Sequence, residues 1–380
     1  MAKKALKILE YIILFGLGVV LVWIALRGID WKVFVDNLHT VRWEFVALSG
    51  FCCLCALILR AERWKDMLLP LDPSATFVKA WDANNLGNLS YLVVAGSGDF
   101  VRTAGVTNKT ITYDKVFGTV LMERAWDSLM VIVVTVLAII FKQDAIIGFL
   151  KDSVLKPAAG RMSLKLWIIL GVVIIAVIVF CVLIYKLRDK SKFFGKIAEW
   201  LKGVFDGIKA FLVMDRKGRF AVYTLLIWFF YVAMCQCVFW AMPGLGHLTF
   251  ADALFLSAIG NFATIIPVPG GMGAFHYIIA LAMSQIYGYG WEVGILFATL
   301  THESRTILLV VLGAVSALAM GIRRGKRKAA IDAAAEPAKA AAPAEPIEPA
   351  SPVEPASPAE LAVPVEPASP ASPAEPVGDK

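Results

Sequence analysis

Histidine is scarce in this chain of 380 residues. Only four are present: His39, His247, His276 and His302. The pair His302-Glu303 begins like the His-Glu-x-x-His motif of zinc proteases, but Thr306 stands where the second histidine is needed. The sequence therefore predicts no histidine-based metal centre, and nothing in it indicates a cofactor.

Signature motifs of soluble enzymes are also missing. The sequence contains no P-loop, no Gly-x-Ser-x-Gly elbow and no dinucleotide-binding Gly-x-Gly-x-x-Gly between a strand and a helix. The segments between its apolar runs are too short for a catalytic domain. We therefore expect that the chain does not hydrolyse ATP and is not an enzyme.

The cysteines show no metal-binding or disulfide pattern. All six lie inside apolar runs, and none is spaced with a histidine as in a zinc site (Cys52, Cys53, Cys55, Cys181, Cys235, Cys237). They are expected to pack between helices as small apolar side chains.

Apolar residues dominate the sequence. They make up 59% of the chain, with a mean hydropathy of +0.71, against about 45–50% in soluble domains. Six apolar runs are each long enough to cross a bilayer, at roughly 8–26, 43–59, 116–141, 164–185, 219–241 and 291–319. The pattern predicts an all-α polytopic membrane protein with about six full transmembrane helices. The first of them should remain uncleaved, because no signal-peptidase site follows it.

Two further stretches are apolar but interrupted. Residues 77–97 carry polar side chains on one helical stripe (Asp82, Asn84, Asn85, Asn88), so this helix cannot face lipid. Residues 251–287 are broken by a segment rich in Pro and Gly, and irregular backbone at that depth persists only inside protein or beside a cavity. We expect two re-entrant or broken elements, which brings the membrane segments to eight and resembles the inverted repeats of transporters.

Basic residues indicate the topology. Lys and Arg gather at 3–7, 60–65, 186–219 and 323–328, and cytoplasmic loops are enriched in these residues. Both termini are then cytoplasmic, in a plasma (bacterial inner) membrane. The positive charge is therefore a topology signal, and no nucleic-acid partner is expected.

Composition divides the chain into two parts. Residues 1–328 form the expected membrane domain. Residues 329–380 are rich in Ala, Pro, Glu and Ser and repeat Glu-Pro-Ala-Ser-Pro at 354–358 and 366–370. Such a segment has too little apolar surface to fold, so we expect a disordered cytoplasmic tail.

The most unusual feature is a group of charges inside the third apolar run. It comprises Glu123, Arg124 and Asp127. An ionised side chain at the bilayer centre costs about 2.5–3.5 kcal/mol on insertion scales, so these residues indicate a functional site. The alternative is an ion-pair network that braces the helices, with Arg102 or Arg305 as partner.

Two glycine-rich turns carry further candidates. Asn88, Asp99 and Arg102 lie around the first turn, and the guanidinium fork of Arg102 suits phosphate or carboxylate. A capped loop with an interfacial arginine is the alternative.

The second turn is Pro267-Val-Pro-Gly-Gly-Met-Gly273, which precedes a helical run. Its glycines Gly270, Gly271 and Gly273 would offer backbone N–H groups and a positive helix end to an anion. A hinge without a ligand would have the same sequence. Arg305, in the last run, is either a further ligand-binding residue or a boundary residue near the head groups.

In this order the motifs resemble the flippase-like membrane domain of the lysylphosphatidylglycerol synthase family. That family has Arg-x-x-Arg-Trp, Gly-Glu-x-x-Arg, Glu-Arg-x-x-Asp, Pro-x-Pro-Gly-Gly-x-Gly-x-x-Glu and a late Arg. The matching positions here are 60–64, 98–102, 123–127, 267–273 and Arg305. The resemblance covers about residues 5–322. It implies lipid translocation without lysyl transfer, because no soluble aminoacyl-transferase domain is recognisable.

Three positions depart from the family pattern. Asp99 replaces a glutamate, Ala95 replaces the usual proline before the glycine pair, and His276 replaces the last glutamate. Histidine titrates near neutral pH where glutamate does not, so a different head-group preference is expected.

Together these features predict a flippase- or scramblase-like translocator. Its substrate would be a phospholipid or a polyprenyl-phosphate-linked lipid with an anionic or zwitterionic head group. Arg102, Arg124 and Arg305 would hold the phosphate, and Glu123 and Asp127 would orient them or receive an amine. The alternatives are a membrane-embedded lipid-phosphate transferase with one of these carboxylates as general base, and a non-transporting assembly partner.

Overall fold

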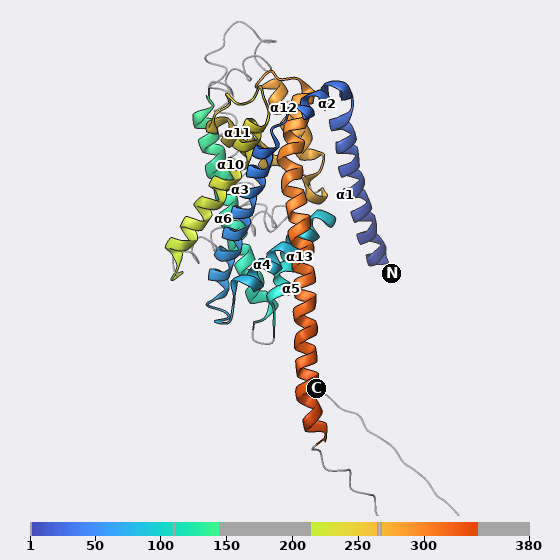
Figure 1. Ribbon diagram of the computed structural model, residues 1–380, viewed down its shortest axis with the longest axis vertical. Helices are drawn as coiled ribbons and strands as arrows, with labels where there is room; N and C mark the ends of the chain where they lie inside the picture. Colours follow the sequence, from blue (N-terminus) through green and yellow to red (C-terminus); the bar gives the residue numbers. More distant parts are fainter. Residues whose placement is uncertain (1, 109–110, 144–213, 264–265, 267, 341–380) are drawn as a thin grey trace, which may run out of the picture. The chain divides into compact units, whose positions relative to one another are not determined.

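The computed structural model describes residues 2–108, 111–143, 214–263, 266 and 268–340. These residues form ten α-helices and one turn of 3-10 helix, with no strand among them (Figure 1). The chain divides into two compact units, residues 1–326 and 327–380. The all-α class expected from the sequence is confirmed.

Four described helices are long and apolar enough to cross a membrane. They are α3 (Trp43–Leu68), α6 (Tyr113–Phe141), α10 (Lys217–Ala241) and α13 (Trp291–Ala340). Each coincides with one of the predicted apolar runs. The first run lies in α1 (Ala2–Leu26), and the run at 164–185 lies outside the described residues.

A short helix, α2 (Trp31–His39), follows α1. Its start is fixed by Asp30, whose carboxylate accepts hydrogen bonds from the backbone N–H groups of Lys32 and Val33 at 2.9 and 3.2 Å. Side-chain capping of this kind satisfies donors that the first helical turn leaves free.

The first interrupted stretch is a pair of helices, α4 (Phe77–Val93) and α5 (Gly98–Val106). The backbones of the two helices are in close contact: a Cβ added at Gly98 would lie only 2.8 Å from the Gly87 carbonyl oxygen. Two glycines therefore set how closely the helices approach.

The polar stripe of α4 is buried, as expected for a helix that cannot face lipid. Asp82 forms an ion pair with Arg323, and the Asn85 amide donates a hydrogen bond to Ser316 Oγ at 3.2 Å. Both partners are on α13, so this stripe joins the two helices.

The second interrupted stretch consists of α11 (Phe250–Phe262), the 3-10 turn η4 (Pro269–Gly271) and α12 (Ala274–Gln285). The predicted break is confirmed. Gly270, Gly271 and Gly273 have φ of 63°, 79° and 77°, in the left-handed region that L side chains avoid. Gly273 also allows α1 to approach, since an added Cβ would lie 2.5 Å from the backbone nitrogen of Val22.

The tips of the two interrupted stretches meet. A Cβ added at Gly270 would lie 3.2 Å from Cδ2 of Leu92, at the end of α4. Around them, α3 packs on α10, α6 and α10 pack on α11, and α1 packs on α12. The largest apolar core is built mainly from α10, α11 and the first turns of α13.

Helix α13 continues to Ala340, although the sequence predicted disorder from residue 329. The first part of the tail is rich in alanine, which has the highest helix propensity, so a helix is able to extend into it. Residues 341–380 lie outside the described residues.

Candidate functional site

Seven charged side chains from three helices form one arginine–carboxylate cluster. Helix α3 contributes two, α5 two and α6 three (Arg60, Arg63, Asp99, Arg102, Glu123, Arg124, Asp127). Residues three or four apart share a helix face, which explains why Arg60 with Arg63, and Glu123 with Asp127, point the same way. Four arginines and three carboxylates leave a net charge of +1 when all are ionised.

Glu123 is the centre of the cluster and its side chain is fully buried. One carboxylate oxygen accepts from Arg63 at 2.8 Å and from Arg60 at 3.3 Å. The other accepts from Arg102 at 2.6 Å. Three guanidinium groups on a single carboxylate give this residue a local excess of positive charge.

Arg63 is buried as completely as Glu123. It also donates to Asp127 at 2.8 Å and to the Thr224 hydroxyl of α10 at 3.0 Å. Its guanidinium lies 5.4 Å from the ring centroid of Phe220, a cation–π distance. The buried arginine is thus oriented from both α6 and α10.

Arg102 is oriented in a similar way from α4 and α3. It donates to the Asn84 side-chain oxygen at 3.1 Å, and its guanidinium lies 5.1 Å from the Trp64 ring centroid. These contacts give each residue of the Arg-x-x-Arg-Trp motif a role. Trp64 packs on the guanidinium of Arg102, and Arg60 and Arg63 form ion pairs with Glu123.

Arg124 and Asp99 form the accessible rim of the cluster. Two guanidinium nitrogens of Arg124 donate to the two carboxylate oxygens of Asp99, at 2.9 and 2.7 Å. The Arg124 side chain is 49% exposed, unlike the buried arginines. This bidentate pair has the geometry in which arginine also binds a phosphate.

Three guanidinium nitrogens of the cluster donate no hydrogen bond within the described part of the chain. They are Arg63 Nε, Arg102 Nε and Arg102 Nη2, all buried, although Arg102 Nε lies 3.2 Å from Asp99 in an ion pair. A buried donor without an acceptor costs roughly 1–3 kcal/mol, more for a charged group. The cluster therefore has unused capacity for an anion.

The structure brings five of the predicted site residues into this cluster: Asp99, Arg102, Glu123, Arg124 and Asp127. Asn88 is partly buried on α4, and its side chain makes no hydrogen bond to any described residue. Arg305 is exposed on α13 and makes no ion pair within the described ranges. Of the two arginines expected as partners of Glu123, only Arg102 is one.

Arg60 and Arg63 are helical, and the expectation from the sequence that they belong to a loop is wrong. They lie within α3, which continues nine residues past the apolar run that ends at residue 59. The apolar run ends at the first charged residue, Arg60. The helix continues beyond it because Arg60 and Arg63 form ion pairs with the buried Glu123. Their i,i+3 spacing on the same face as the preceding apolar residues was the available signal.

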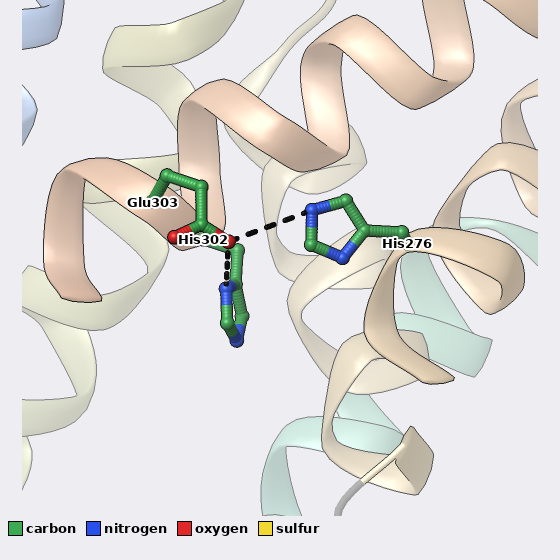
Figure 2. A group of neighbouring side chains, drawn as sticks. All are labelled: His276, His302 and Glu303. Carbon is green, nitrogen blue, oxygen red and sulfur yellow. Dashed lines mark hydrogen bonds and ion pairs between the residues drawn. The ribbon is translucent and has the colours of Figure 1, made fainter. Parts of the chain in front are cut away.

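A second group of side chains surrounds the glycine-rich turn. We call it the histidine–glutamate cluster: His276 from the first turn of α12, with His302 and Glu303 from α13. Figure 2 shows both imidazoles directed at the carboxylate of Glu303. His302 Nε2 lies 2.9 Å from the Gly270 carbonyl oxygen, so the turn and α13 are directly joined.

The glycine-rich turn and His276, which were predicted to bind substrate, therefore lie at the histidine–glutamate cluster. They are not part of the arginine–carboxylate cluster. Gly270 contributes its carbonyl oxygen here rather than an N–H group. A Cβ at Gly271 would lie 3.8 Å from His302 Nε2, and Gly273 faces α1.

The family described as "Lysylphosphatidylglycerol synthase TM region" matches residues 8–313. The chain belongs to this family. It is also similar to the UPF0104 membrane protein PH1989 of Pyrococcus horikoshii, with 24% identity over 300 residues that cover 69% of this chain and 82% of that protein. No solved structure matches the chain.

Family membership and the apolar helices make this a multi-pass membrane protein. The matched range includes both clusters and ends before the alanine-rich end of α13. Both groups of charged and polar residues thus belong to the membrane region that defines the family.

Proposed function

We propose that the protein translocates a lipid across the plasma membrane and binds the lipid phosphate at the arginine–carboxylate cluster. The observation that supports this most directly is a cluster with net positive charge and unsatisfied guanidinium donors among membrane-spanning helices. Ionisable residues within the membrane usually line a substrate pathway or pair with one another. The residues of this cluster pair with one another, and their unsatisfied donors support a substrate-binding role as well.

The rim offers an entry point for the phosphate. Asp99 occupies both guanidinium nitrogens of Arg124, and it is itself partly exposed. A phosphate group presents two oxygens with a comparable spacing, so it can replace the Asp99 carboxylate without moving Arg124. An anionic or zwitterionic phospholipid, or a polyprenyl-phosphate-linked lipid, carries the required group.

Access to the buried donors requires a conformational change, since Arg63 Nε and Arg102 Nη2 are not exposed. The two interrupted stretches supply movable elements next to the cluster, because α5 carries Asp99 and Arg102 and its partner α4 touches Gly270. In our proposal the chain has six full spans, two broken elements and cytoplasmic termini. Broken helices that meet near the midplane are typical of alternating-access transporters.

A transferase is less well supported. A general base must accept a proton from the substrate, but both carboxylate oxygens of Glu123 already accept from arginines, and the side chain is fully buried. We therefore propose transport without a chemical step on the lipid.

Replacing Arg124 tests the proposal. Arg124→Ala should slow head-group transfer roughly ten- to a hundredfold, because a hydrogen bond to a charged group is worth about 1.5–3 kcal/mol. Transfer is measured in proteoliposomes that contain fluorescent phosphatidylglycerol or phosphatidylethanolamine, with an impermeant reductant that bleaches the outer leaflet.

Arg219 provides a matched control outside the cluster. Its side chain is also 49% exposed and pairs with an aspartate, Asp66, at 3.3 Å. Arg219→Ala should transfer lipid at the wild-type rate. Normal transfer by Arg124→Ala, or an equal loss in both variants, would contradict a role of the cluster in phosphate binding.

A further inference from the structure

The histidine–glutamate cluster has the composition of a metal site. Its three potential ligand atoms lie within 4.8 Å of one another. His302 Nδ1 is 2.9 Å from Glu303 Oε1, and His276 Nε2 is 3.8 Å from the same oxygen (Figure 2). One carboxylate oxygen thus faces two imidazole nitrogens from different helices.

The hydrogen bonds of His302 determine where its proton is. Nε2 faces the Gly270 carbonyl oxygen at 2.9 Å, and a carbonyl oxygen can only accept, so Nε2 carries the hydrogen. In the neutral ring, Nδ1 is then a lone pair pointing at a carboxylate oxygen. Two acceptors at 2.9 Å repel each other unless a cation lies between them, which is either a second proton or a metal ion.

The surroundings of His276 favour a metal ion over a second proton. Its Nδ1 is buried without a hydrogen bond, and its Nε2 is beyond hydrogen-bonding distance of Glu303, so neither nitrogen is satisfied by a described residue. A second proton on His302 would leave His276 unsatisfied. A metal ion would be bound by both rings and by the carboxylate.

We propose that His276, His302 and Glu303 bind a divalent transition-metal ion, with Zn²⁺ as the best match. Two imidazole nitrogens and one carboxylate oxygen are a common zinc ligand set, whereas Mg²⁺ and Ca²⁺ prefer oxygen ligands alone. The Gly270 carbonyl orients the His302 ring, as the outer hydrogen-bond partners of metal-bound histidines do.

The distances require only a small adjustment. Ligands at about 2.1 Å from zinc are at most about 4.2 Å apart. The two pairs with Glu303 are already within that limit, at 2.9 and 3.8 Å. The histidine nitrogens lie within 4.8 Å of each other, so a slight rotation of one ring is sufficient. Three protein ligands also leave a coordination position for water or a phosphate oxygen.

The site fixes the glycine-rich turn and α12 to α13. It lies outside the arginine–carboxylate cluster, so the inference does not depend on the proposed transport. It also revises the expectation from the sequence, which found no metal centre because the two histidines are 26 positions apart and belong to no motif.

Metal content tests the site directly. The full chain is purified in detergent without a polyhistidine tag, treated with a chelator, dialysed against buffered Zn²⁺ and analysed by inductively coupled plasma mass spectrometry. Wild type should retain stoichiometric zinc, and His276→Gln and His302→Gln should lose it. His39→Gln and His247→Gln are matched controls, because both of these histidines are exposed and outside the cluster.

Cobalt gives a measurement that needs no variant. Co²⁺ bound to wild type should show the visible bands of a nitrogen- and oxygen-ligated site without thiolate charge transfer, and Zn²⁺ should displace it. Absence of bound metal would overturn the proposal. Binding that survives both cluster substitutions, or a thiolate spectrum that points to the cysteines, would overturn it as well.

Discussion

The two polar clusters differ in how many of their side chains find a hydrogen-bond or ion-pair partner within the protein. In the arginine–carboxylate cluster each carboxylate accepts from at least one arginine, and Glu123 accepts from three. In the histidine–glutamate cluster, two imidazoles share one carboxylate oxygen and His276 has no hydrogen bond among the described residues. The first cluster is largely complete without a ligand, and the second is not.

This difference predicts how much each cluster contributes to stability. The first cluster can still bind the proposed phosphate, through Arg124 at its rim and through its unsatisfied guanidinium donors. A buried charge whose partner is removed becomes uncompensated, so a complete cluster contributes to folding. A group that the protein leaves unsatisfied contributes little until a ligand arrives. The same substitution, glutamate to glutamine, should therefore have very different effects in the two places.

The largest effect is expected for Glu123→Gln. The change leaves Arg60, Arg63 and Arg102 without their shared counter-charge and should lower the free energy of unfolding by roughly 3–5 kcal/mol. Denaturant unfolding in detergent micelles measures this. Glu62→Gln is the control, because Glu62 pairs with Lys65 at a partly exposed position and should change stability by under about 1 kcal/mol. Equal stability of the two variants would contradict a structural role of Glu123.

An intermediate effect is expected for Gly98→Ala, which alters the packing beneath the complete cluster. The added methyl would meet the Gly87 carbonyl at 2.8 Å and push α5, with Asp99 and Arg102, away from α4. Overpacking of this kind typically costs about 1–3 kcal/mol. Thermal unfolding followed by circular dichroism should show a lower midpoint.

Gly118→Ala serves as the control for that prediction. Gly118 is within α6 and has nothing within 4 Å of an added Cβ. Alanine in an open helical position is better than glycine, so this variant should be as stable as wild type or slightly more stable. A destabilisation equal to that of Gly98→Ala would mean that the α4–α5 contact is not the cause.

The smallest effect is expected for Glu303→Gln in metal-free protein. The amide can donate to His302 Nδ1, so the contact at 2.9 Å is kept and unfolding should change by less than about 1 kcal/mol. Adding Zn²⁺ should raise the midpoint of wild type but not that of the variant. A large loss of stability of metal-free Glu303→Gln would contradict the difference between the clusters, because Glu303 would then stabilise the fold as Glu123 does.

Much of the fold could be predicted from the sequence, because apolar runs and helix breakers act locally. The runs that became α3, α6, α10 and α13 were identified, as was the break at Pro267–Gly273. The runs and the break depend on residue type and spacing within one segment. The sequence also offered Arg102, beside Arg305, as a partner of Glu123, because buried charges of opposite sign pair.

The errors concern which distant segments meet. Arg60 and Arg63 resembled a loop because hydropathy does not detect a buried charge with a partner. Arg305, which matches the late arginine of the family and was expected to hold the phosphate, is exposed on α13 and lies outside the arginine–carboxylate cluster. His276 and His302 come together only when α12 folds back on α13, which no local pattern encodes.

Gly270 lies where three segments of the membrane region meet: the glycine-rich turn, the end of α4 and α13. It has a left-handed backbone and so little room that an added Cβ would lie 3.2 Å from Leu92 Cδ2 at the end of α4, and its carbonyl oxygen lies 2.9 Å from His302 Nε2. A side chain at position 270 would therefore disturb two contacts at once, one with the end of α4 and one with the imidazole on α13. A single residue without a side chain thus lets three segments of the membrane region meet at one point.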